Sequence, residues 1–322
     1  MTSSDSVSDA GHTSGYTPSA TPLDPLAQQP AGVVRLRNAA GDTAMVSLYG
    51  AQVLSWCTAA GGEQLYCSPH LTSAAGLAEV ASQGRALRGG VPVCFPQFSD
   101  RGPLPKHGLV RTQVWRLTDA PHPAGTGDTN NAVSARFTFT DSEATRAVWP
   151  HPFALALQVV LGTSTLELRL QVTNTGASAL AFTAALHTYL AVPDIRHTRL
   201  VGLAGTTYAD ALAHLTTAVQ GNAALHIEDE LDRVYLDTPA ELTLNATALT
   251  RLHIAQQGFT DTVVWNPGPA KAATLGDMPA ADWTRMLCIE AAAVQHPVQL
   301  PPGAIWQGSQ RFEVQQTADN GL

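Results

Sequence analysis

Alternation of apolar and polar residues is the strongest pattern along the chain. In residues 164–174, STLELRLQVTN, the side chains of Leu166, Leu168, Leu170 and Val172 fall on one face of an extended segment and the polar side chains on the other. A two-residue period of this kind is typical of a strand that is buried on one side.

Similar short strings recur between the two ends, among them GVVRLRN, TAMVSLYG, AVSARFTFT, FALALQVVLG and MLCIEAAAV, with Gly, Pro, Asn or Asp in most of the gaps. Residues 71–84, LTSAAGLAEVASQG, predict a short helix, and Pro279–Asp282 predict the first turn of another. Many short strands between turn residues favour an all-β fold, a large antiparallel β-sandwich with few short helices.

The two ends of the chain lack this pattern. Residues 1–31 consist mostly of Ser, Thr, Gly, Pro, Ala and Asp with few large aliphatic side chains, so we expect a disordered leader. Residues 317–322 predict a flexible tail for the same reason. Residues 32–316 are expected to form a single β-sandwich domain.

The net charge of the chain limits the classes of partner that it can bind. Only 14% of the residues are charged, and the formal net charge is −8, whereas an average soluble domain has roughly 25% charged residues. An acidic chain without a basic cluster is a poor candidate for binding nucleic acid or an anionic membrane. Any anion that it binds must therefore be held by a local group of cations.

The four cysteines show no CxxC pair and lie in apolar strings; they are Cys57, Cys67, Cys94 and Cys288. This spacing predicts buried free thiols in a reducing compartment and neither disulfides nor a metal site. No apolar run approaches the roughly 18 residues of a membrane helix. The N-terminus has no charged segment of the secretory type, so we expect a cytoplasmic protein.

Two titratable residues break the apolar strings. Glu290 lies in the middle of the expected strand RMLCIEAAAV, and His187 lies within the expected strand AFTAALHTYLAV. Glu290 alone could be paired with a buried arginine or face solvent, and a lone histidine in such a strand is usually a satisfied core residue. Together, on different strands lined by small residues, they make a plausible acid and base couple.

Cations are concentrated in two strings. Arg88 precedes two glycines in ALRGGVPVCFPQF, and Lys106, His107 and Arg111 lie within LPKHGLVRT. Two arginines on adjacent loops could clamp a phosphate, since the guanidinium fork matches its oxygens, or they could be ordinary surface residues. His107 is expected to shape its loop or to bond a hydroxyl.

Other polar positions allow two readings. In DELDRVYLDTP, Asp232, near Tyr235, could accept hydrogen bonds from sugar hydroxyls or cap a turn. Trp265 and Asn266 are more often packing and turn residues. Nucleotide loops of the GxGxxG or GxxxxGK[ST] type are missing, as are HExxH and GxSxG. A cofactor-free acid and base reaction on a small polar anion fits what remains.

Six ordered strings resemble the glucose-6-phosphate 1-epimerases, or hexose-6-phosphate mutarotases, a branch of the aldose 1-epimerase superfamily. They are LRGGVPVCFPQF, LPKHGLVRTQVW, LHTYLAVPDI, DRVYLDTP, VVWNP and MLCIEAAAV, and the resemblance runs from about residue 33 to 315. It implies a galactose mutarotase-like β-supersandwich that uses neither a cofactor nor a metal.

The resemblance also implies roles for residues. His187 and Glu290 match the catalytic histidine and glutamate, Arg88 and Arg111 match the arginines that hold the sugar phosphate, and Asp232 matches a substrate-binding aspartate. Lys106 stands where the family often has a neutral residue. The strings NPGPAK after Trp265 and EAAAV after the glutamate depart from the family pattern.

The expected reaction is the interconversion of the α and β anomers of a hexose 6-phosphate, with an ionised Glu290 as the base and a protonated His187 as the acid. Three alternatives stay open: an epimerase for unphosphorylated sugars, a non-catalytic carbohydrate-binding sandwich, and a polysaccharide lyase or hydrolase. The expected partner is a small sugar phosphate, with no nucleic acid and no membrane, and a monomer is favoured over an oligomer.

Overall fold

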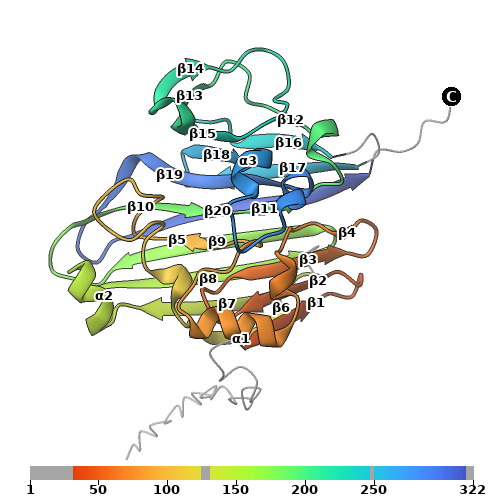
Figure 1. Ribbon diagram of the computed structural model, residues 1–322. Helices are drawn as coiled ribbons and strands as arrows, with labels where there is room; N and C mark the ends of the chain where they lie inside the picture. The colour runs from red at the N-terminus through yellow and green to blue at the C-terminus, as the bar shows by residue number, and fades with distance from the viewer. Residues whose placement is uncertain (1–31, 125–130, 247–249, 317–322) are drawn as a thin grey trace, which may run out of the picture.

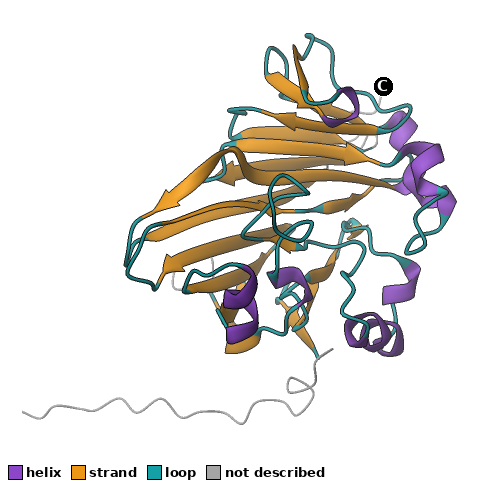
Figure 2. Ribbon diagram, turned by 60° about the vertical axis from the view of Figure 1, so that its left-hand side comes forward, coloured by secondary structure: helices purple, strands orange, loops and turns teal. Residues whose placement is uncertain are grey.

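The structure is a computed structural model that describes residues 32–124, 131–246 and 250–316. Within these residues the chain forms three antiparallel sheets, one of four strands and two of eight. The two large sheets are stacked as layers, with the helices and longer loops at their edges (Figure 1, Figure 2). The predicted antiparallel β-sandwich with few short helices is confirmed, whereas the expected leader and tail lie outside the described residues.

The small sheet begins the described chain. Its strands follow one another in sequence order: β1 (Val33–Arg37), β2 (Thr43–Ser47), β3 (Val53–Thr58) and β4 (Gly62–Glu63). It lies at the lower right in Figure 1, and its buried side chains join the apolar core of the large sheets.

We call the first large sheet the rear sheet. Its strands, from edge to edge, are β12 (Arg199–Val201), β16 (Glu241–Asn245), β17 (Thr250–Gln257), β20 (Ile305–Gln316), β9 (Thr165–Asn174), β8 (Phe153–Gly162), β7 (Val133–Thr140) and β6 (Arg116–Pro123). β9 contains the alternating string of residues 164–174. Its predicted apolar face is fully buried, because Leu166, Leu168, Leu170 and Val172 are at most 1% exposed.

We call the second large sheet the front sheet. Its order is β14 (Thr216–Val219), β13 (Thr207–Asp210), β15 (Leu231–Tyr235), β18 (Asp261–Asn266), β19 (Met286–Leu300), β10 (Leu180–Leu186) and β5 (Val93–Cys94), with β11 (Tyr189–Ala191) also paired to β19. One face packs against the rear sheet through side chains such as Leu186, Val264, Leu287 and Ile289. The other face carries the polar residues considered below.

Helices are few and short. The predicted helix of residues 71–84 is present as α1 (Ala74–Ser82), where the Ser73 side chain accepts a hydrogen bond from the Gly76 amide and so caps the first turn. The turn predicted at Pro279–Asp282 belongs to the 3₁₀ helix η6 (Ala280–Arg285). The others are α2 (Glu143–Val148), α3 (Gly268–Ala272), η2 (Pro69–Leu71), η3 (Val110–Thr112), η4 (Ile195–His197) and η5 (Ala211–Ala213).

Two further findings concern the general class of protein. All four cysteines are free, with Cys94 and Cys288 buried and Cys57 and Cys67 half-buried. No helix in the described part of the chain is both long enough and apolar enough to cross a membrane.

Candidate active site

The front sheet sets the site residues in adjacent rows. Its register aligns Asp232 on β15 with Trp265 on β18, Trp265 with Cys288 on β19, and Cys288 with Tyr189 on β11. Alternate residues of a strand share a face, so Glu290 lies on the same face as Cys288, two residues further along β19. The polar residues that interrupt the alternation therefore gather on one side of the sheet.

His187 lies where the pairing of the front sheet is interrupted. The flanking pairs Leu186–Ala291 and Tyr189–Cys288 keep one register and place His187 opposite Glu290. The His187 amide continues the pairing with β5 by donating to the Pro92 carbonyl, but the next amide, that of Thr188, donates to the Leu186 carbonyl instead of to β19. The predicted single strand is thus divided into β10 and β11, and the catalytic candidates are cross-strand neighbours at the break.

The two side chains contact each other in a buried environment. His187 Nδ1 lies 3.4 Å from Glu290 Oε1, and the residues are only 7% and 1% exposed. Neither His187 Nδ1 nor Glu290 Oε2 has a hydrogen-bond partner among the described residues. A buried polar atom without a partner is costly, so these atoms are suited to receive a ligand.

Burial shifts the two side chains in opposite directions. It raises the pKa of Glu290 well above its ordinary value, with help from the negative charge of Asp232. It lowers the pKa of His187 well below its ordinary value, and the nearby His107, Arg111 and Arg88 act in the same direction. We expected an ionised glutamate and a protonated histidine at rest, but burial favours the neutral form of both.

His107 is a second histidine beside the His187–Glu290 pair. Its Nδ1 accepts a hydrogen bond from the Ser99 amide at 3.3 Å and lies 3.2 Å from Cys94 Sγ. A backbone amide can only donate, so the proton of the neutral ring is on Nε2. Burial and three neighbouring cations lower the pKa of His107 to about 3. His107 is therefore a neutral ring that can donate from Nε2, and its bond to a substrate hydroxyl stays a prediction.

Aromatic rings form one wall of the site. The Tyr189 ring stacks on the His187 ring with centroids 4.8 Å apart, and Trp265 contacts both rings edge to face at 6.2 and 6.1 Å. The His107 ring meets His187 from another side at 5.2 Å. The imidazole of His187 is therefore held in one orientation by its neighbours.

Arg88 lies at the cavity wall but is already paired. Its guanidinium donates to Asp277 Oδ2 at 2.9 to 3.0 Å and to the Tyr189 hydroxyl at 3.1 Å. The Tyr189 phenol and the Asp277 carboxylate raise the pKa of the guanidinium, which stays charged. Asp277 therefore offsets much of the Arg88 charge locally, and the expected role of Arg88 in a phosphate clamp stays a prediction.

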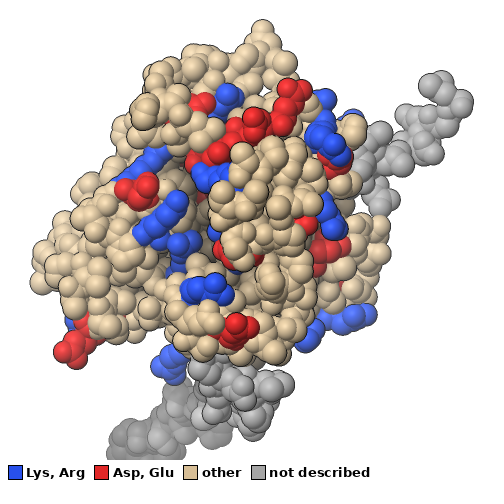
Figure 3. Space-filling model, viewed as in Figure 1, with Lys and Arg blue, Asp and Glu red and all other residues tan. Residues whose placement is uncertain are grey.

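Arg111 and Lys106 remain available as cations. Among the described residues, the hydrogen bond of the Arg111 guanidinium is to the Lys106 carbonyl, at 2.9 Å, and neither side chain forms an ion pair with a carboxylate. Both line the same cavity, of about 1120 Å³, as His107, His187, Arg88, Asp232 and Glu290. Figure 3 shows Lys and Arg side chains beside a hollow on this face of the molecule.

Asp232 and its neighbours close another side of the cavity. Burial raises the pKa of Asp232, while Lys271, Arg101 and Lys106 act against this rise. Tyr235, on the opposite face of β15, is fully buried and donates to Gln220 at 2.8 Å, so it lies away from the cavity. Asn266 stabilises the turn that follows β18, because its side-chain amide donates to the Trp283 and Met286 carbonyls at 2.8 Å.

One group of metal-ligating side chains occurs in the described residues, and it overlaps the acid and base pair. Ligand atoms of His187, Cys288 and Glu290 lie within 4.8 Å of one another. Burial raises the pKa of the Cys288 thiol well above its ordinary value, and a thiol binds a metal only after it loses its proton. Cys288 also does not line the cavity, so the arrangement fits a proton-transfer pair better than a metal site.

The structure brings together all seven residues selected from the sequence, His187, Glu290, Arg88, Lys106, His107, Arg111 and Asp232. The sequence analysis missed Asp277 and the contacts of Tyr189. Asp277 lies in an ordinary Gly-Asp loop string far from Arg88 in sequence, which gives no signal. Tyr189 could have been selected, because it follows His187 on the same face of the expected strand.

Comparisons with known proteins identify the family of this chain. Residues 32–313 match the model of the aldose 1-epimerase family. A protein of Cenchrus ciliaris, provisionally named glucose-6-phosphate 1-epimerase, is 35% identical over 299 residues, which cover 89% of this chain and 87% of that protein. A Salmonella typhimurium protein with the same provisional name is 32% identical over 259 residues, covering 80% of this chain and 81% of the relative.

Solved structures of mutarotase-like proteins resemble this chain in fold. A crystal structure from Salmonella typhimurium, provisionally described as a mutarotase, superposes with a TM-score of 0.75 at 31% identity and covers 86% of this chain and 88% of the other. A galactose mutarotase-like protein from Lactobacillus casei has a TM-score of 0.67 at 16% identity, with 88% and 100% coverage, and so shares the fold. With its sequence matched from β1 to β20, this chain belongs to the aldose 1-epimerase family.

Proposed function

We propose that the protein interconverts the α and β anomers of a hexose 6-phosphate, with glucose 6-phosphate as the expected substrate, by general acid and base chemistry of its side chains alone. The observation that carries the proposal is the buried His187–Glu290 pair at 3.4 Å, on the wall of a cavity that cations also line. The provisional names of the relatives support the same reaction.

The proton inventory of the pair suits this reaction. A neutral glutamic acid beside a neutral histidine holds the same number of protons as a carboxylate beside an imidazolium, so the two forms interconvert by one transfer within the pair. In the ionised form, Glu290 takes the proton of the anomeric hydroxyl while His187 gives one to the ring oxygen. The bond between C1 and the ring oxygen breaks, and the pair is left neutral.

Ring closure uses the neutral form. The open aldehyde turns about its C1–C2 bond, and the ring hydroxyl then attacks either face of C1. His187 takes the proton of that hydroxyl, Glu290 returns its proton to the aldehyde oxygen, and the ionised pair is restored. Burial makes the ionised pair scarce, but it also makes the carboxylate a stronger base and the imidazolium a stronger acid, because each reacts toward its favoured neutral form.

The cations support a phosphate-bearing substrate. Arg111 and Lys106 line the cavity without a carboxylate partner among the described residues, although the chain as a whole has a formal net charge of −8. A phosphate dianion would satisfy both. Arg88, which is paired with Asp277, and Asp232 are better suited to bind sugar hydroxyls.

The test is the rate at which pure α-glucose 6-phosphate relaxes to its anomeric equilibrium, followed by NMR. We expect the wild type to accelerate this relaxation and Glu290→Gln to lose about 10²- to 10⁴-fold of the acceleration, the usual effect of one proton-transfer group. Loss should appear in kcat, since the amide keeps the size of the carboxyl group.

Controls separate the alternatives. Free glucose should react poorly, and inorganic phosphate should compete with glucose 6-phosphate in the wild type but less in Arg111→Gln. Equal rates for both sugars with no competition by phosphate would identify an epimerase for unphosphorylated sugars. Binding of the sugar without any acceleration would identify a non-catalytic carbohydrate-binding protein.

A further inference from the structure

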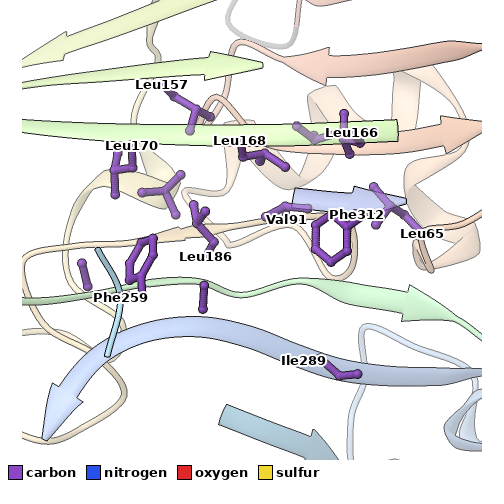
Figure 4. Close-up of a cluster of buried hydrophobic side chains, with 14 of the residues drawn as sticks. Leu65, Val91, Leu157, Leu166, Leu168, Leu170, Leu186, Phe259, Ile289 and Phe312 are labelled. Carbon is purple, nitrogen blue, oxygen red and sulfur yellow. The ribbon is translucent and has the colours of Figure 1, made fainter. Parts of the chain in front are cut away.

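A buried glutamine interrupts the apolar face of β20 directly behind the site. The inward positions of this strand are Trp306, Gly308, Gln310, Phe312 and Val314, and Gln310 is 0% exposed. Figure 4 shows Phe312 from this strand and Ile289 from β19 in the same apolar cluster. A primary amide in such surroundings is costly unless both its oxygen and its nitrogen are hydrogen-bonded.

Both polar atoms of Gln310 reach across the core to the front sheet. The Thr188 hydroxyl donates to Gln310 Oε1 at 2.7 Å, and Gln310 Nε2 donates to the Ile289 carbonyl at 3.0 Å. The Ile289 amide in turn donates to the Thr188 carbonyl at 3.1 Å. The three residues form a closed ring of hydrogen bonds.

The ring contacts the backbone behind both catalytic candidates. Thr188 follows His187 and Ile289 precedes Glu290, so the side chains of the ring face the core while the two candidates face the cavity. The ring also lies where β10 and β11 are separated and ordinary strand pairing is interrupted. Gln310 thus supplies contacts that the sheet lacks at this point.

We propose that Gln310 is a positioning residue, which fixes the spacing between His187 and Glu290 by tying Thr188 to Ile289 from the opposite sheet. The proposal rests on the proposed function for its effect on catalysis, but the spacing itself can be measured without substrate. Gln310 does not line the cavity, so it acts on the pair and not on the sugar.

The experiment compares Gln310→Met with the wild type, because methionine keeps the length of the side chain and removes both hydrogen bonds. We expect kcat to fall about 10- to 100-fold, the size of effect that follows when reacting groups move by about 1 Å, with KM changed less than twofold. Thr188→Val removes only the hydroxyl bond and should show a smaller loss of kcat. It also serves as the deciding variant if Gln310→Met does not fold.

Two other buried amides give matched controls. Asn174 donates to the Ser178 and Leu300 carbonyls at 2.8 Å, away from the cavity, so Asn174→Leu should lower the melting temperature without changing kcat of the folded enzyme. Gln52 donates to the Leu87 and Gly89 carbonyls on either side of Arg88, at 3.2 and 2.7 Å. Gln52→Met should therefore raise KM more than it lowers kcat.

A second readout is independent of activity. The imidazole nitrogens of His187, followed by NMR through a pH titration without substrate, report its contact with Glu290. We expect Gln310→Met to move this titration and Asn174→Leu to leave it unchanged. An unchanged His187 titration together with wild-type kcat in Gln310→Met would overturn the proposal. A wild type with no anomer exchange would overturn the proposed function only, since the titration would still report the spacing.

Discussion

At the scale of single residues, the chemistry of the site follows from taking two titratable groups out of water. Burial favours the neutral form of each, so the pKa of Glu290 rises and the pKa of His187 falls. At pH values between the pKa of His187 and the pKa of Glu290, the two side chains together hold one proton. The groups that set the local field face the pair from several elements; they are His107, Arg88, Arg111, Lys106, Asp232, Cys288 and Tyr189.

This arrangement predicts the pH dependence of kcat/KM. The acidic limb should mark the second protonation of the pair, at His187, and lie below the ordinary pKa of histidine. The basic limb should mark loss of the shared proton, at Glu290, and lie well above the ordinary pKa of glutamate. The negative charge of Asp232 contributes to the raised pKa of Glu290, so Asp232→Asn should move the basic limb to lower pH.

The measurement is the pH profile of kcat/KM for wild type and Asp232→Asn. The phosphate group of the substrate titrates near about 6, but it does so equally with both enzymes and cannot produce a difference between them. A basic limb that stays in place, or moves to higher pH, in the variant would contradict the assignment of that limb to Glu290.

At the scale of elements, the position of Arg88 depends on close backbone contact in the segment that follows it. Gly89 and Gly90 both have positive φ angles, of 116° and 59°, and a Cβ atom at Gly90 would lie 2.0 Å from the Val53 carbonyl oxygen. The Gly90 amide donates to the Tyr66 carbonyl and the Val91 amide to the Val53 carbonyl. The segment is therefore fixed between two neighbouring chains.

Gly90→Ala should lower the free energy of unfolding by more than the roughly 1–2 kcal/mol expected for a left-handed alanine alone, because the Cβ atom also meets the Val53 carbonyl. Gly84→Ala is the matched control: its φ of 64° is similar, and its Cβ atom would meet nothing within 4 Å. The two variants can be compared by urea unfolding. Equal losses would show that the close approach at Gly90 has no energetic weight.

At the scale of the whole molecule, one apolar cluster joins the three sheets. It contains Leu36 from β1, Leu168 from β9 and Ile289 from β19, each 0% exposed. Because the site residues stand on the outer face of the front sheet and their inward neighbours belong to this cluster, the cavity depends on the whole sandwich. That residues 32–316 form a single domain stays a prediction, and the unfolding of a core variant can test it.

Leu168→Ala tests that coupling. It should lower the free energy of unfolding by about 2–5 kcal/mol, as expected when a buried leucine leaves a cavity, and the wild type and the variant should each unfold in one transition. Scanning calorimetry checks this, since equal calorimetric and van't Hoff enthalpies indicate a single cooperative unit. Two separate transitions would show that the sheets unfold independently.

The sequence by itself determined the features that depend on neighbouring residues. Alternation in residues 164–174 identified a half-buried strand because side chains of a strand point to opposite faces at every step. Polar residues at buried positions, Glu290 and His187, identified the candidate pair because such groups are rarely buried without a purpose. The order of the short strings indicated the family, and all of the selected residues line one cavity.

Tertiary structure alone decided the features that join distant parts of the chain. The register of β10 and β11 on β19 places His187 opposite Glu290, and the fold gives Arg88 its partner Asp277, 189 residues away. It also brings Gln310 behind the pair from the other sheet. The preference for neutral forms follows from burial, which a local pattern cannot measure, because exposure and electrostatic neighbours are properties of the packed molecule and not of the string of residues.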